Sequence, residues 1–101
     1  MELPKTSEFA EAKSKSVSMV AAVKLARAEI RAVSDKPVDS IAKCERSGDG
    51  GWLIALDLVE SPARLGENDL LSRFMMRMEA DGSVVGIEHA GRYRREDGPR
   101  P

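Results

Sequence analysis

Two hydrophobic periods follow one another along the chain, and the change falls near Pro37. From Ser18 to Val33 apolar residues recur at spacings of three and four, which predicts an amphipathic helix. Its apolar stripe consists of Met19, Val20, Val23, Ala26, Ile30 and Val33. Ser16 or Ser18 can cap its start, and Lys36-Pro37 ends it because proline disfavours helix in the preceding residue. We expect the stripe to pack on a sheet formed by the rest of the chain.

After Pro37 apolar and polar residues alternate, which indicates β-strands. The predicted strands cover Val38–Glu45, Trp52–Glu60, Leu70–Ala80 and Ser83–Tyr93. Trp52 begins the apolar face of the second strand, and we expect it to be a buried anchor of the core. The pattern therefore predicts an α+β fold, with an N-terminal amphipathic helix packed on a mostly antiparallel sheet of about four strands.

The last two predicted strands are joined by Asp81-Gly82, the strongest short signal for a β-hairpin. A two-residue loop predicts that apolar residues pair across the strands, Met78 with Val85, Met76 with Ile87, and Phe74 with His89. We expect His89, at the end of this apolar face, to be half-buried and hydrogen-bonded.

Composition divides the chain into one domain with two loose ends. Residues 1–16 are polar and of mixed charge, which predicts a flexible N-terminal arm, and residues 17–95 form the single α+β domain. Residues 96–101 contain Gly98, Pro99 and Pro101 and are expected to be disordered.

Charge and length exclude several function classes. The 101 residues carry a net charge of −1, from 16 basic and 17 acidic side chains, which argues against a nucleic-acid-binding protein. No apolar stretch is long enough to span a membrane or to act as a secretory leader. A single cysteine excludes an intrachain disulfide, so we expect a cytoplasmic protein.

The residues for catalysis are scarce. Cys44 and His89 are the only residues of their kinds, and no third group is placed to orient them. Asp57 and Glu60 are three apart on a strand, so they point to opposite faces and do not form an acid–base pair. Metal and phosphate sites need ligand sets and glycine-rich loops that this chain lacks. We therefore expect no catalytic residues, no cofactor and no metal.

A polar surface at one end of the sheet is the better candidate for function. Arginine binds carboxylates through two parallel hydrogen bonds, which lysine cannot do. The predicted partner-binding residues are Glu60, Arg64, Arg92, Tyr93 and Arg95. In an alternative interpretation, Arg92 and Arg64 brace Glu60 and Asp57 inside the domain.

An ordered set of motifs resembles one known family. It comprises Asp49-Gly50-Gly51-Trp52, Ala55-Leu56-Asp57-Leu58-Val59-Glu60, Arg64, Asn68-Asp69-Leu70-Leu71, Phe74, Asp81-Gly82 and Arg92-Tyr93-Arg94-Arg95. Over about residues 20 to 95 the chain is similar to the gas vesicle protein O family. Ile87 and His89 stand where that family has tyrosine and arginine. The resemblance implies a non-enzymatic accessory protein that binds other gas vesicle proteins during assembly, possessing no membrane span and working in the cytoplasm or on the vesicle.

Two other interpretations stay open. A helix followed by a tryptophan-led strand and an Asp-Gly hairpin also resembles PepSY domains, which are peptidase propeptide and inhibitor modules that bind peptides. The apolar stripe of the helix also allows a homodimer, in which the chain acts as a dimeric adaptor.

Overall fold

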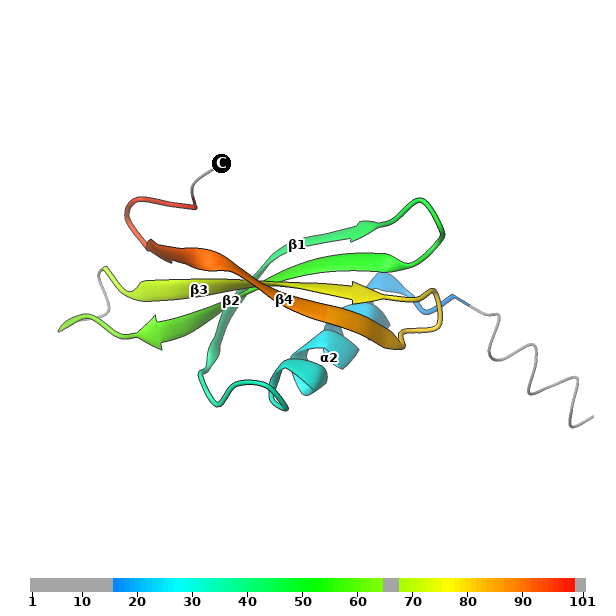
Figure 1. The fold of residues 1–101 in the computed structure, drawn as a ribbon, viewed down its shortest axis with the longest axis horizontal. Coiled ribbons are helices and arrows are strands. Elements are labelled where there is room, and N and C mark those ends of the chain that lie inside the picture. Colours follow the sequence, from blue (N-terminus) through cyan, green and yellow to red (C-terminus); the bar gives the residue numbers. More distant parts are fainter. Residues whose placement is uncertain (1–15, 65–67, 100–101) are drawn as a thin grey trace, which may run out of the picture.

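One helix and four antiparallel strands make up the part of the chain that the structure describes, which confirms the α+β prediction. The computed structural model describes residues 16–64 and 68–99, so most of the predicted arm and the last two residues of the predicted tail lie outside it. The elements are α2 (Met19–Ile30), β1 (Val38–Arg46), β2 (Trp52–Ser61), β3 (Leu70–Met78) and β4 (Val84–Arg94). The strands follow one another across the sheet in chain order, and α2 packs on one face (Figure 1).

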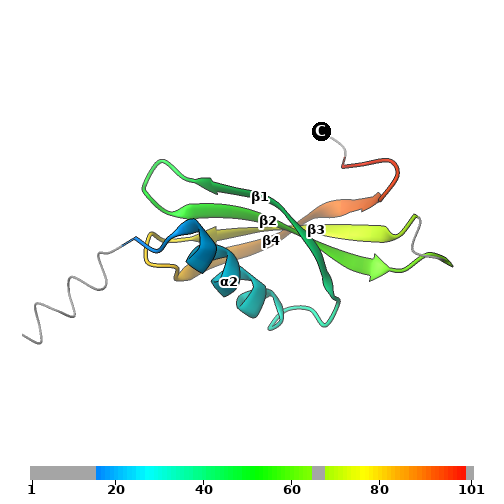
Figure 2. The ribbon, with the colours of Figure 1, turned by 180° about the vertical axis from the view of Figure 1, so that it is seen from behind.

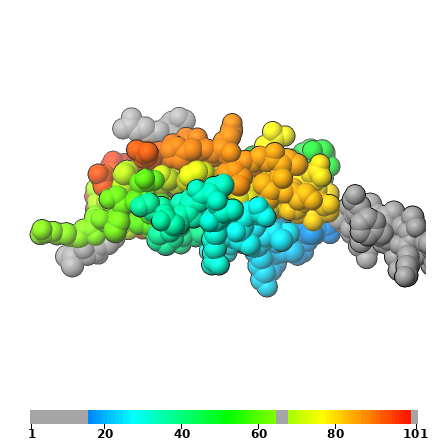
Figure 3. Space-filling view, turned by 60° about the horizontal axis from the view of Figure 1, so that its bottom comes forward, coloured from blue at the N-terminus to red at the C-terminus, as the bar shows by residue number. Residues whose placement is uncertain are grey.

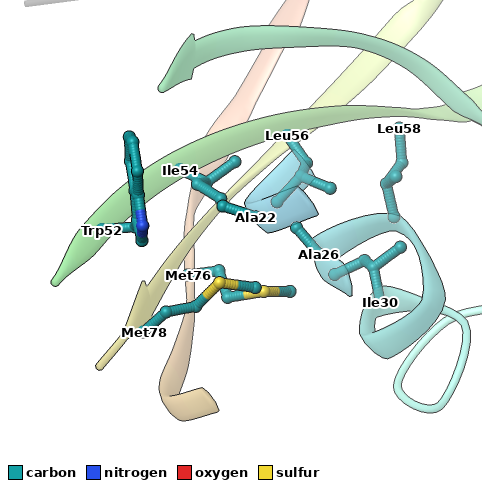
Figure 4. Close-up of a cluster of buried hydrophobic side chains, with 9 residues drawn as sticks. All are labelled: Ala22, Ala26, Ile30, Trp52, Ile54, Leu56, Leu58, Met76 and Met78. Carbon is teal, nitrogen blue, oxygen red and sulfur yellow. The ribbon is translucent and has the colours of Figure 1, made fainter. Parts of the chain in front are cut away.

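The hydrophobic core lies between α2 and the sheet face that it covers. Alternation along β2 and β3 sends every second side chain toward the helix, as Figure 4 shows. The buried cluster consists of Ala22, Ala26, Ile30, Trp52, Ile54, Leu56, Leu58, Met76 and Met78. Trp52 is only 3% exposed, which confirms it as part of the core, and the guanidinium of Arg46 lies 4.4 Å from the centre of its ring system.

The helix faces the sheet with only part of the predicted stripe. Its buried residues are Ala22, Ala26 and Ile30. The stripe residues Met19, Val20 and Val33 are instead 53%, 66% and 55% exposed. Small side chains let a helix backbone approach a sheet closely, so Ala22, which the stripe omits, joins Ala26 in the contact. The prediction is confirmed for Ala26 and Ile30. It is wrong for the exposed residues, because it relied on the size of the side chains and not on how closely the helix backbone can approach the sheet.

The ends of α2 are set by local hydrogen bonds. Ser18 is the N-cap, as one of the two predicted serines, and its hydroxyl accepts a hydrogen bond from the Ala21 N–H. The helix ends at Ile30, earlier than expected, because its carbonyl accepts from the N–H groups of both Val33 and Ser34 in a following turn. Pro37 therefore follows the helix at a distance instead of ending it.

The β3–β4 hairpin has a longer loop than expected. The predicted pairs Met76–Ile87 and Phe74–His89 are confirmed, but Met78 lies opposite Val84 and not Val85. The loop contains three residues, because the Glu79 N–H binds the Ser83 carbonyl and Gly82 adopts a φ of 92°. The register shifts by one residue between Met78 and Arg77, which leaves Val85 unpaired and 56% exposed.

The two ends of the sheet differ in what surrounds them. In Figures 1 and 2, α2 lies near the β1–β2 and β3–β4 turns, whereas the C-terminal end of β4 lies at the opposite end, with the β2–β3 connection. We call the first the helix-covered end. None of the helical segments within 16–64 and 68–99 is long and apolar enough to cross a membrane.

Candidate functional site

Charged and hydroxyl side chains gather at the end of the sheet away from α2. Antiparallel pairing brings the end of β2, the start of β3 and the end of β4 together there. We call this the polar end and define it by Asp39, Asp57, Glu60, Asp69, Ser72, Arg73, His89, Arg92, Tyr93 and Arg95.

Asp57 is the buried acid of the polar end. It lies directly opposite Arg73 in the β2–β3 register, on the face that α2 does not cover. The Arg73 Nε and Nη2 donate to its two carboxylate oxygens at 2.8 and 2.9 Å, and the Tyr93 hydroxyl donates to Oδ2. Asp57 is 2% exposed, so these donors replace the water that it loses on folding.

The same contacts keep Arg73 and Tyr93 protonated. The hydrogen bond and charge of Asp57 raise the pKa of Arg73 above its ordinary value, so the guanidinium stays charged. Burial, and then the hydrogen bond to Asp57, raises the pKa of Tyr93, so its hydroxyl remains a donor at neutral pH. The Arg73 guanidinium also lies 5.5 Å from the centre of the Tyr93 ring. The cluster therefore fixes two strands and the Tyr93 ring relative to one another.

Glu60 belongs to the opposite face, the one that carries α2. The Ser72 hydroxyl donates to its carboxylate at 2.6 Å, and this bond lowers the pKa of Glu60, with smaller contributions from the charges of Arg92 and Lys36. The His89 Nε2 lies 3.4 Å from the Ser72 oxygen, and its ring lies 5.0 Å from the Phe74 ring. His89 is exposed, whereas we expected it to be half-buried, because the strand that carries it is an edge of the sheet.

Arg95 lies at the edge of the polar end and connects two of its acids. Its guanidinium donates to both oxygens of Asp39 on β1 and to Asp69 before β3, with shortest distances of 2.8 Å. Asp69 also accepts from the Ala63 N–H at 2.7 Å, and this bond, followed by that of Arg95, lowers its pKa. Arg95 thus ties the end of β4 to the first strand and to the β2–β3 connection.

The arrangement does not resemble a catalytic triad, although serine, histidine and a carboxylate meet in it. A nucleophilic serine gives its proton to a histidine that an acid orients. Here the Ser72 hydroxyl donates its hydrogen bond to Glu60 and not to a histidine, and Ser72 is only 1% exposed. Across the described residues, no three potential metal ligands lie close enough together to hold an ion.

The five residues predicted from the sequence are distributed over several surfaces. Glu60 and Arg92 share the α2 side of the sheet, and Tyr93 lies on the other side with Asp57. Arg95 sits at the rim in ion pairs within the chain. Arg64 is exposed in the β2–β3 connection. Asp57 and Glu60 do point to opposite faces, as the strand period predicts.

Sequence reasoning missed Arg73, Ser72 and Asp39. Arg73 is the principal partner of Asp57, whereas the bracing interpretation expects Arg64 or Arg92 there. The β2–β3 register decides this pairing, and it contains an irregularity between Val59 and Ser61. The turn motif of a tight hairpin allows the strand register to be predicted from the sequence, but the longer β2–β3 connection contains no such motif.

Comparisons with known proteins decide the family. The sequence model of the family described as "Gas vesicle synthesis protein GvpO" matches residues 5–98, nearly the whole chain. The chain belongs to this family. This confirms the resemblance that the Gly-Trp strand and the closing Arg-Tyr-Arg-Arg motif indicate.

A curated relative points the same way. The chain is 33% identical over 72 residues to the "Gas vesicle protein O" of Haloferax mediterranei, an alignment that covers 71% of this chain and 51% of the relative. The chain thus spans about half the length of the family member that it matches. No solved structure matches it.

Proposed function

We propose that the chain is a non-enzymatic accessory protein of gas vesicle formation, which works in the cytoplasm by binding other gas vesicle proteins during assembly. Family membership supports the process. The observation that carries the binding role is that Arg92 is exposed, on a strand whose backbone is held by pairing with β3.

Two kinds of arginine can be separated at the polar end. Arg73 and Arg95 make bidentate or bridging hydrogen bonds to acids of the same domain. Arg92 acts on Glu60 through its charge. Its side chain takes no part in the ion pairs among the described residues, although its backbone is paired with β3. We assign the first kind to bracing the sheet and the second to a partner's carboxylate.

Arg64 extends this surface. It is exposed in the β2–β3 connection, close in sequence to Ala63, whose N–H is fixed by Asp69. Loops held by a rigid scaffold commonly carry binding residues. The proposed contact surface is therefore Arg92 with Arg64, and Glu60 lies beside Arg92.

Capture of gas vesicle proteins from vesicle-forming cells tests this proposal. The tagged chain is expected to retain identified gas vesicle proteins, and Arg92→Ala and Arg64→Ala each to retain less at an unchanged melting temperature. Arg77→Ala, an exposed arginine on β3, is the matched control and should bind normally. Capture of no gas vesicle protein by the unmodified chain would refute the proposal.

The non-enzymatic part has a test of its own. The double variant Cys44→Ser with His89→Gln removes the only thiol and the only imidazole. If it folds normally, it should support vesicle formation as the original chain does. Loss of vesicles from a well-folded double variant would show that one of these groups has a chemical role.

A further inference from the structure

A second cationic surface lies where α2 ends and β1 begins. A groove with a volume of about 490 Å³ opens between the C-terminal half of the helix and the segment that follows it. Its charged lining residues are Arg27, Arg31, Asp35 and Lys36, and Pro37 and Val38 supply an apolar part. In Figure 3 this segment, in cyan to blue-green, lies across the middle of the face shown.

The cations of the groove make no ion pair with an acid of the described chain. Arg27 lies in the last turn of α2 and Arg31 is its C-cap, with a helical backbone conformation. The two are four residues apart and therefore project from the same side of the helix. The ion pairs among described residues use Lys43, Arg73 and Arg95 instead. With Asp35 as the only acid of the lining, the groove keeps an excess of positive charge.

A structural role explains part of this pattern. Cations near the C-terminus of a helix interact favourably with the helix dipole, and Arg27 and Arg31 lie there. The effect is confined to the last turn, so it does not account for Lys36, which follows the helix end by several residues. It also does not account for the concave shape or for the apolar residues beside the charges.

We propose that this groove binds a short carboxylate-rich segment of a partner protein. Arginine guanidinium groups pair with carboxylates bidentately, and the apolar wall suits the aliphatic part of glutamate side chains. A nucleic acid is a poorer match, since such sites gather many phosphate contacts and a basic excess, whereas this chain has a net charge of −1.

The groove and the polar end are neighbouring surfaces. Lys36 lines the groove and is also one of the charges that lower the pKa of Glu60. A partner that reaches from Arg27 to Arg92 would contact both surfaces. That this partner is a gas vesicle protein rests on the proposed function; binding of an acidic segment does not.

Binding of a fluorescent hexaglutamate peptide to the full chain at low salt tests the groove directly. Hexaglutamine is the uncharged control peptide, and added salt should weaken the hexaglutamate complex. Arg27→Gln, Arg31→Gln and Lys36→Gln should each weaken binding about two- to five-fold, as expected for exposed ion pairs, and the triple variant should abolish it. Lys24→Gln, an exposed residue of the same helix outside the groove, should bind like the original chain.

Several results would overturn the proposed acidic ligand of the groove. Equal binding of the two peptides, or an equal loss in Lys24→Gln, would overturn the proposal. So would variants of Arg27 and Arg31 that melt earlier yet bind the peptide normally, since only the helix dipole would then be involved. Tighter binding of a single-stranded oligonucleotide than of hexaglutamate would replace the acidic segment by a nucleic acid. If hexaglutamate binds as expected but no gas vesicle protein is captured, only the proposed function fails.

Discussion

The helix-covered end and the polar end bury their side chains by different means. At the first, α2 covers an apolar face in which Trp52, Ile54 and Met76 are nearly inaccessible. At the second, Asp57 and Ser72 are just as inaccessible, at 2% and 1% exposure, but each is held by directed hydrogen bonds.

This difference separates stability from recognition. Apolar burial contributes free energy in proportion to area and has little directionality. Charged pairs contribute less, but they fix orientation, and their partners cannot be removed singly without leaving a buried charge. A chain of this size can therefore rely on one end for its stability and use the other to present arginines in a fixed geometry.

Trp52→Ala tests the first half of this comparison and should have the largest effect. Truncating a buried tryptophan costs about 3–5 kcal/mol of unfolding free energy, and each kcal/mol lowers the melting temperature by about 4–8 °C in a domain of this size. Trp52→Phe should cost less, because the indole Nε1 that it removes is buried without a partner among the described residues. Val85→Ala, at an exposed position, is the control for calorimetry. Equal melting of Trp52→Ala and Val85→Ala would show that stability does not reside at this end.

Arg73→Met tests whether the polar end is held by charge pairing. It leaves the Asp57 carboxylate buried with only the Tyr93 hydroxyl, and breaking a buried pair from one side costs about 3 kcal/mol or more. The double variant Asp57→Leu with Arg73→Met removes both charges and should recover much of the loss. Denaturant unfolding of the single and double variants measures the coupling. A single-variant loss below about 1 kcal/mol, the range of an exposed pair, would contradict the account.

Gly51→Ala should have a smaller effect, at the junction that starts β2. A Cβ atom at Gly51 would lie 2.2 Å from the Met78 carbonyl oxygen, so the paired strands must move apart. Overpacking of this kind costs about 1–3 kcal/mol. Gly48→Ala, in the same turn with no atom within 4 Å of the added carbon, is the matched control. Thermal melting of the two variants should differ; equal values would mean that the junction is not tightly packed.

Lowering the pH should reduce the melting temperature by less than any of the substitutions above, through the carboxylates of the polar end. The pKa of Glu60 and that of Asp69 are both lowered on folding, from ordinary values of 4.5 and 3.8. A lowered pKa adds stability above the ordinary value, and this contribution is lost as the pH falls through the folded value. The melting temperature should therefore decline below about pH 4.5, and less steeply in Glu60→Gln and Asp69→Asn than in the exposed control Glu88→Gln. Equal acid profiles in all three would exclude these two carboxylates.

The fold class and the strand positions could be predicted because the hydrophobic period changes once, from helical to alternating. The side of α2 that faces the sheet could be predicted only in part: the stripe includes the buried Ala26 and Ile30 but omits Ala22, which carries little hydrophobic signal although it allows close packing. Likewise, Asp81-Gly82 predicts a turn but does not distinguish a two-residue loop from the observed three-residue loop, in which Val85 is not paired with Met78.

The polar end was predictable in its location and less so in its pairing. Alternation along a strand was enough to place Asp57 and Glu60 on opposite faces. The partner of Asp57 depends on the β2–β3 register, which includes an irregularity near Ser61 that no turn motif signals. Arg73 is therefore visible in the sequence only as one more charged residue on a strand.

Capture and unfolding free energy measured together on the Arg64→Ala/Arg92→Ala double variant test the central claim most directly. If these exposed arginines serve recognition, the double variant should lose most of its capture of gas vesicle proteins while its unfolding free energy falls by no more than about 2 kcal/mol, since each exposed charge contributes about 0–1 kcal/mol. Undiminished capture by a normally folded double variant would contradict the claim that the polar end is the binding surface.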